Sequence, residues 1–198
     1  MSYRVKQITV SFAVLLLVFA VHSVGMASVV INELHYNPPA PDGRDLEFVE
    51  LYNSGPTAVA IAGWRLDGGI YFEFPTGTII PAAGYVVVCR DRELFAETFN
   101  VSEASLFGNF EGSLDNDGDR VSLLDDFNAV ADIVRFDDRY PWPSGSDSVD
   151  GGGASLERSC PSAAAMLPTN WTSAAGERPA PLATDSRAQC PPPPMSGR

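Results

Sequence analysis

Two acids and a histidine near the start of the chain are the residues best suited to chemistry. Glu33 and His35 alternate within an apolar, β-prone run, so a strand would place both side chains on one face. With a third ligand from Glu47 or Glu50, they would resemble the ligand set of a metal-dependent extracellular hydrolase. Glu47 and Glu50 are three residues apart and face opposite ways on a regular strand, so this geometry offers two ligands rather than three. The favoured interpretation is a polar, partly exposed strand face.

Other catalytic patterns are missing from the sequence. His35 is the only histidine after residue 27, and no GxSxG motif supplies a serine nucleophile for it. The GxGxxG and GxxxxGK[ST] signatures of nucleotide-binding loops are also absent. The sequence therefore predicts a protein that has no catalytic residues and no cofactor.

The acidic segment EGSLDNDGDRVSLLDD could form either a calcium loop or a tight turn. Asp115, Asp117 and Asp119 match the first three ligand positions of an EF-hand loop, but Arg120 then stands where glycine is needed. The register that places a glycine there lacks the acid at position 12. A turn at Asp117 and Gly118, forming the tip of a hairpin, is therefore predicted, and the three aspartates remain weak calcium candidates.

Three aromatic residues are candidates either for binding contacts or for the core. Tyr140 and Trp142 stand together in a proline-rich loop and are the candidate contact residues. Trp64 lies among alternating apolar positions and is predicted to be buried in the core.

The three cysteines cannot all pair within one chain. Cys89 ends an apolar run and is predicted to be a buried free thiol. Cys160 and Cys190 lie in proline-rich, loop-like sequence, and export would permit a disulfide. If any pair forms a disulfide, the sequence favours these two.

The ends of the chain differ in composition from its middle. Residues 1–27 have a short basic start, an apolar run and small residues before the predicted cleavage point, as in a secretory signal peptide. This piece holds two of the 13 basic residues and no acid, so the remainder has 11 basic and 25 acidic residues and a net charge of −14. Such a charge argues against nucleic acid and against membrane contact beyond the signal peptide. Residues 176–198 are rich in proline and are predicted to be a disordered tail.

Between these ends, the pattern indicates strands. Short β-branched and aromatic runs are separated by turn residues at intervals of about ten, as in a β-sandwich or barrel. One short helix is expected over 92–99, capped by Asp91, as a crossover segment. The predicted core residues are Ile31, Leu34, Phe48, Leu51, Trp64, Leu66, Phe74, Val86, Val88, Val121, Leu123 and Val134.

Six segments occur in an order that matches a known family. They are INELHYNP (31–38), EFVELYN (47–53), IAGWRLD (61–67), FPTGTIIPAAGYVVV (74–88), GSLDNDGDRVSLLD (112–125) and VADIVRF (130–136). With them the chain resembles the lamin tail domain, a module of nuclear lamins and of many exported bacterial proteins. The turn at Asn128 departs from the family pattern, because the expected glycine is missing.

The resemblance implies an all-β, immunoglobulin-like β-sandwich over residues 28–175 without a catalytic centre. The expected function is that of a secreted or periplasmic module that binds a protein or a cell-surface polymer. One alternative is the metal-dependent hydrolase built on Glu33, His35 and Glu47. Another is that the chain is the detached non-catalytic part of a larger exported enzyme.

Overall fold

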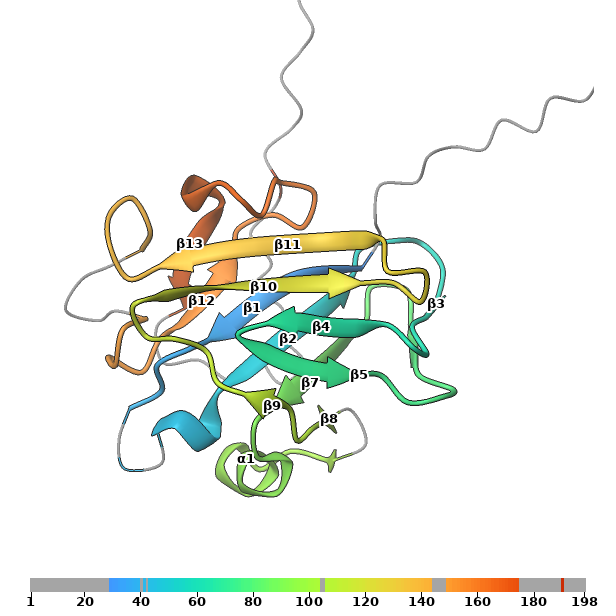
Figure 1. The fold of residues 1–198 in the computed structure, drawn as a ribbon, viewed down its shortest axis with the longest axis horizontal. Coiled ribbons are helices and arrows are strands. Elements are labelled where there is room, and N and C mark those ends of the chain that lie inside the picture. Colours follow the sequence, from blue (N-terminus) through green and yellow to red (C-terminus); the bar gives the residue numbers. More distant parts are fainter. Residues whose placement is uncertain are drawn as a thin grey trace, which may run out of the picture.

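A computed structural model describes residues 29–39, 41, 43–103, 106–143, 149–174 and 190 of the protein. These residues form two facing β-sheets with a small two-stranded sheet beside them (Figure 1). The predicted signal peptide lies outside the described residues, as does the predicted tail apart from Cys190. Within the described part of the chain, none of the helices has the length and apolar character needed to cross a membrane.

The larger sheet has six strands in the order β13-β12-β1-β2-β7-β8. Its strands are β1 (Val29–His35), β2 (Phe48–Asn53), β7 (Tyr85–Cys89), β8 (Leu106–Phe107), β12 (Ser155–Arg158) and β13 (Trp171–Ala174). All neighbours are antiparallel except β7 and β8, which run parallel. A parallel pair needs a crossover connection, and the helix α1 (Arg92–Phe99) lies in it.

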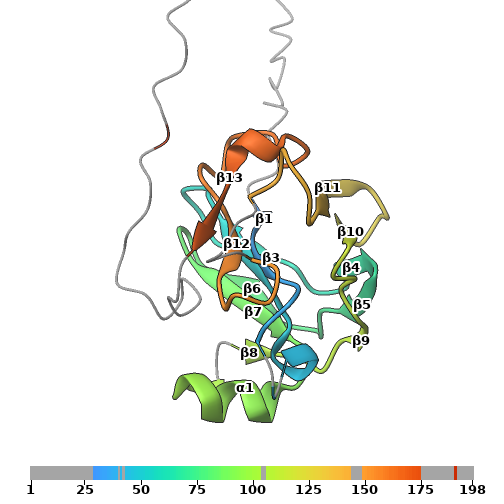
Figure 2. The ribbon, with the colours of Figure 1, turned by 90° about the vertical axis from the view of Figure 1, so that its left-hand side faces the viewer.

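The second sheet has five antiparallel strands in the order β11-β10-β4-β5-β9. Its strands are β4 (Arg65–Gly68), β5 (Ile70–Glu73), β9 (Glu111–Gly112), β10 (Gly118–Leu124) and β11 (Val130–Asp137). The small sheet pairs β3 (Val59–Ala60) with β6 (Ile79–Ile80), and two short 3-10 helices span Gly43–Leu46 and Pro168–Asn170. Figure 2 shows the two layers on edge. The predicted immunoglobulin-like sandwich with one crossover helix is confirmed.

A single apolar cluster fills the space between the sheets. It contains all the predicted core residues except Trp64 and Phe48. Trp64 is only partly buried and packs against the edge of the cluster, so its assignment to the buried core was wrong. A β-bulge between Ile31 and Glu33 shifts the alternation of β1, so that Leu34 and Tyr36 join Ile31 in this core.

A second, smaller cluster lies where α1 packs on the large sheet. Phe48, Val87, Cys89, Phe95 and Leu106 are buried in it. The helix begins after Asp91, whose side chain accepts a hydrogen bond of 3.0 Å from the backbone N–H of Leu94. Cys89 is a buried free thiol, as predicted, and burial raises its pKa to about 12. This thiol is therefore protonated and unreactive at neutral pH.

The two predicted turns had different outcomes. β10 and β11 form a hairpin around the turn at Asn128, which adopts a φ of 67°, a left-handed conformation that asparagine tolerates in place of glycine. A turn also occurs before Gly118, but it is not a hairpin tip. β9 pairs with β5, whereas β10 pairs with β4 and β11. The acidic segment therefore crosses the end of the sheet instead of joining neighbouring strands.

Gly68 fixes the tight turn between β4 and β5. Its φ is 135°, and a Cβ at this position would lie 1.9 Å from the carbonyl oxygen of Arg120 on the neighbouring strand β10. Only glycine allows the two backbones to approach this closely. The dipeptide Gly68-Gly69 therefore sets where β4 turns back as β5.

Candidate functional site

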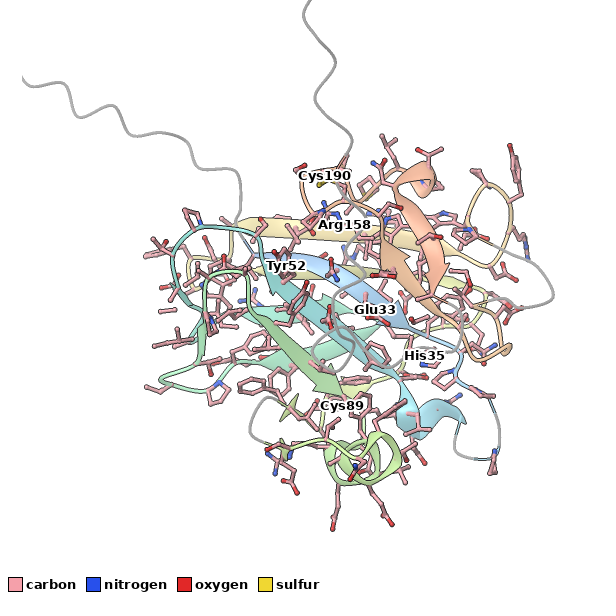
Figure 3. The ribbon with its side chains drawn as sticks, turned by 180° about the vertical axis from the view of Figure 1, so that it is seen from behind. Glu33, His35, Tyr52, Cys89, Arg158 and Cys190 are labelled. Atoms are coloured by element: carbon pink, nitrogen blue, oxygen red, sulfur yellow. A yellow bond between two sulfur atoms is a disulfide. The ribbon has the colours of Figure 1, made fainter. Side chains whose placement is uncertain are left out.

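The acid and histidine on β1 are buried, which corrects the predicted exposure of this strand face. Glu33 is 3% exposed and accepts a hydrogen bond from the hydroxyl of Ser155 on β12. His35 is 7% exposed and packs edge-on against Phe48, with the ring centroids 5.5 Å apart. Burial lowers the pKa of His35 to about 4, so the imidazole is neutral at physiological pH. Figure 3 shows the two side chains following one another along β1.

Glu47 immediately precedes β2 and has a structural role. Its carboxylate accepts a 3.0 Å hydrogen bond from the backbone N–H of Leu114 and a 3.2 Å bond from the hydroxyl of Ser113. It therefore fastens the start of the acidic segment to the chain before β2. Burial raises the pKa of Glu47, and these hydrogen bonds oppose the rise. The described residues contain no group of three His, Cys, Asp or Glu side chains arranged to hold a metal.

The aspartates of the acidic segment mainly hold its own backbone. Asp115 accepts a 3.0 Å hydrogen bond from the N–H of Asp117, which closes a local turn. Asp119 accepts bonds from the backbone N–H groups of Asp115 and Arg120. A calcium ion would have to compete with these bonds. The three residues remain calcium candidates on composition alone.

The aromatic loop residues fall in different environments. Tyr140 is 91% exposed, so it remains a candidate contact. Trp142 is 7% exposed and lies 6.1 Å from Trp171, centroid to centroid, in the main core. The contact assigned to Trp142 from its loop position was therefore wrong, because its neighbouring prolines do not prevent the ring from packing inward.

Cys160 and Cys190 form a disulfide, the pair that the sequence favoured. Trp171 donates a 2.8 Å hydrogen bond from its indole nitrogen to the carbonyl of Ala165. The hydrogen bond holds the turn of residues 159–167 against β13 of the large sheet, whereas the disulfide joins this turn to residue 190. The position of this turn matters because it forms one side of a groove.

The groove lies between this turn on one side and the strands β3 and β11 on the other. Its walls include Val59 and Trp64 on one side, Ala131 on β11, and residues 161–166 on the other side. The volume is about 950 Å³, and Met166 at the margin is 44% exposed. Figure 2 shows the turn that follows β12 standing opposite β11, at the same end of the sandwich. Ligand sites in proteins have this size and predominantly apolar lining.

A buried ion pair forms the polar part of the groove. Arg158 on β12 donates a 2.6 Å hydrogen bond to the carboxylate of Asp132 on β11, and their side chains are 4% and 12% exposed. Arg158 also donates to the carbonyls of Ile31 and Ala163, and Asp132 accepts a 2.9 Å bond from the N–H of Ile31. The pair thus links β1, β11, β12 and the 159–167 turn. Figure 3 places Arg158 near Cys190, away from His35.

Sequence reasoning did not single out Arg158 or Asp132. One usable signal was present: Arg158 is two residues beyond Leu156 and so shares the inward face of its strand. An inward arginine requires a buried acid as partner. The sequence offers 25 acids and no local rule for choosing Asp132 among them.

The family model of the Lamin Tail Domain matches residues 24–138. The match covers more than half of the chain, and the protein belongs to this family. The family comprises non-catalytic, immunoglobulin-like domains, in agreement with the sandwich described above. No curated protein matches the chain. β12, β13 and the 159–167 turn lie beyond the matched residues, so the groove forms where the matched domain meets the chain that follows it.

Proposed function

We propose that the protein is an exported, non-catalytic module that binds a partner protein through the groove between β11 and the 159–167 turn. The single observation that carries this proposal is the groove itself, which has predominantly apolar walls and includes the exposed Met166, next to Leu167 in the chain. Leu167 is 54% exposed. Exposed apolar surface around a concavity is typical of protein–protein contact sites.

The arrangement of the other candidate residues supports an interaction role over hydrolysis. Glu33 is engaged by Ser155, Glu47 is engaged by Leu114 and Ser113, and His35 is buried against Phe48. In these positions the three side chains stabilise the fold. The apolar leader of residues 1–27 supports export, and the charge of the remaining chain supports a partner other than nucleic acid or an anionic membrane.

Site-specific photo-crosslinking tests the proposal. A benzoylphenylalanine at Met166 should capture a defined partner in the extracellular fraction of the producing cells. The matched control is the same residue at Tyr71 on β5, which is 43% exposed, close to the 44% of Met166, and does not line the groove. One recurrent product from Met166 and none from Tyr71 is expected. Identical products from both positions, or none from either, would refute the proposal.

A further inference from the structure

The strand β11 lies at an edge of the second sheet (Figure 1). It has eight residues, is the longest of the described strands, and pairs with none of them except β10. The other edges of the two main sheets are β13, β8 and β9, which have four, two and two residues. An open edge presents unpaired N–H and C=O groups, and proteins usually keep such edges short or covered. A long open edge is therefore a candidate for pairing with another strand.

The hydrogen bonds of β10 show which groups of β11 point outward. The carbonyl of Arg120 on β10 accepts a 3.2 Å hydrogen bond from the N–H of Gly69, which lies on the side of β4. In an antiparallel pair, opposite residues alternate between pairs that exchange main-chain bonds and pairs that do not. Arg120 is opposite Arg135, so this pair exchanges none, and the same holds two residues along, where Ser122 is opposite Ile133. The N–H and C=O groups of Ile133 and Arg135 therefore point away from β10.

These outward groups are available to a second chain. In the part of the chain that the structure describes, neither Ile133 nor Arg135 has a main-chain hydrogen bond to a segment on this side. An extended strand laid along β11 would bond to all four groups. The second sheet is antiparallel throughout, and antiparallel pairing is slightly more stable per residue than parallel pairing. Antiparallel addition would therefore continue this sheet.

Arg135 adds a charge preference to the edge. Its side chain is exposed and lies directly opposite that of Arg120, and like charges in this position destabilise a sheet. Arg120 lies 3.5 Å from the carboxylate of Asp67, whereas Arg135 has no ion pair among the described residues. An acidic side chain opposite Arg135 on an added strand would lie on the same face. It would supply the counter-charge that Arg135 lacks.

The groove begins at this edge, because Ala131, Asp132 and Ile133 of β11 are among the residues that line it. Successive side chains of a strand point to opposite faces of the sheet. The residues on either side of the acidic one would therefore point as Val134 and Phe136 do, toward the space between the two sheets. The groove lies beside that space and has a predominantly apolar lining, which suits apolar side chains at these positions.

We infer that the partner adds an extended segment to the edge of β11 as an antiparallel strand. Its main chain bonds to the outward groups of Ile133 and Arg135, an acidic residue lies opposite Arg135, and the residues next to that acid are apolar and face the groove. This inference rests on the proposed function, since it specifies the form of the segment that binds at the groove. The main chain provides the binding, and the charge sets the register.

A peptide with a modified main chain tests strand addition directly. The probe is the blocked heptapeptide Val-Thr-Val-Glu-Val-Thr-Val, and its binding to the purified protein is followed by amide NMR shifts. N-methylation of the central glutamate removes a donor that faces β11, whereas N-methylation of the valine before it alters a group that faces away. The first change should weaken binding at least about tenfold, and the second should leave it unchanged within about twofold. Equal losses, or a greater loss from the valine change, would overturn the inference.

Amide hydrogen exchange tests the edge itself. In the free protein, the amides of Ile133 and Arg135 should exchange fast, and those of Val134 and Phe136 should exchange slowly because they bond to β10. Saturation with the heptapeptide should slow exchange at Ile133 and Arg135 at least about tenfold. Slow exchange of these two amides in the free protein would overturn the inference, because the edge would then already be covered.

Two variants separate the main-chain and charge contributions. Ile133→Pro removes one outward N–H without removing a bond to β10, and an edge strand tolerates proline at such a position. It should weaken binding of the heptapeptide at least about tenfold. Arg135→Glu should reverse the charge preference, so that a heptapeptide with a central lysine binds about threefold more tightly than the one with glutamate.

The control Arg44→Glu makes the same charge change at an exposed residue outside β11 and should keep the natural preference for glutamate. Thermal unfolding establishes that each variant is folded. An unchanged preference in Arg135→Glu, or undiminished binding in a folded Ile133→Pro variant, would overturn the inference.

Crosslinking from Met166 in the same variants distinguishes this inference from the proposed function. An unchanged product in both Ile133→Pro and Arg135→Glu leaves the interface in place and overturns strand addition. Selective binding of the heptapeptide without any product from the natural protein supports strand addition and refutes the proposed function. A dimer of the natural protein in analytical ultracentrifugation that Ile133→Pro converts to a monomer would show that a second copy occupies the edge, and would overturn the inference.

Discussion

Acidification below neutral pH should destabilise this protein through His35. The imidazole is buried against Phe48, and its Nε2 is buried with no hydrogen-bond partner among the described residues. Burial lowers its pKa from the ordinary value of 6.5 to about 4. The unfolded chain therefore binds a proton as the pH falls through about 6.5, whereas the folded chain does so only near pH 4. The stabilisation by neutral His35 is complete above about pH 6.5 and is lost progressively toward pH 4.

The size of the effect follows from the two pKa values. Between pH 7 and pH 5 the free energy of unfolding should fall by about 2 kcal/mol from this residue alone, given about 1.4 kcal/mol for each unit by which a pKa differs between the two states. Glu47 acts in the opposite direction. Its pKa is raised in the fold, so its contribution is present below its ordinary pKa and is lost as the pH rises through the raised value.

Urea unfolding from pH 7 to pH 4.5, followed by tryptophan fluorescence, measures this dependence in the natural protein and in His35→Phe. The other histidine of the sequence, His22, lies in the predicted signal peptide, so His35 is the only histidine expected to titrate in the chain after residue 27. The variant should lose the fall of about 2 kcal/mol and keep the contributions of the carboxyl groups. Parallel pH profiles for the two proteins would refute the argument that His35 is neutral because it is buried.

Further predictions concern packing, the covalent link and one turn. Trp171→Ala should lower the free energy of unfolding by about 3–5 kcal/mol because its ring is buried. Trp64→Ala should lower it by only about 1–2 kcal/mol because its ring is partly exposed. Equal losses for the two variants in chemical denaturation would contradict this difference. Cys190→Ser should cost about 3 kcal/mol, since the disulfide closes a loop of 30 residues, and reduction of the natural protein should reproduce the loss. Gly68→Ala should prevent the turn between β4 and β5 and abolish cooperative thermal unfolding, because its Cβ would overlap the carbonyl of Arg120. A cooperative transition with a midpoint temperature within a few degrees of that of the natural protein would show that this contact is not tight.

Local features of the sequence were enough to determine most of the elements. The alternation of apolar residues in β10 and β11, with a turn residue between them, defined their hairpin. Asp91 defined the start of α1 because a capping carboxylate acts within one helical turn. Proline-rich context and an odd cysteine count favoured the disulfide between Cys160 and Cys190 over one with Cys89. These signals act over a few residues or depend on composition, so they can be read without the fold.

The tertiary structure alone decided which distant groups meet. Trp142 is buried because Trp171 lies beside it, and β9 pairs with β5 instead of β10. Asp132 meets Arg158 across 26 positions of the chain, and the groove beside them requires five separated segments to come together. Such contacts depend on how the layers pack, because an acid has the same local preferences whether or not it later faces an arginine. The sequence by itself thus determined a lamin tail sandwich, and the packing of its two sheets decided where that sandwich offers a binding groove.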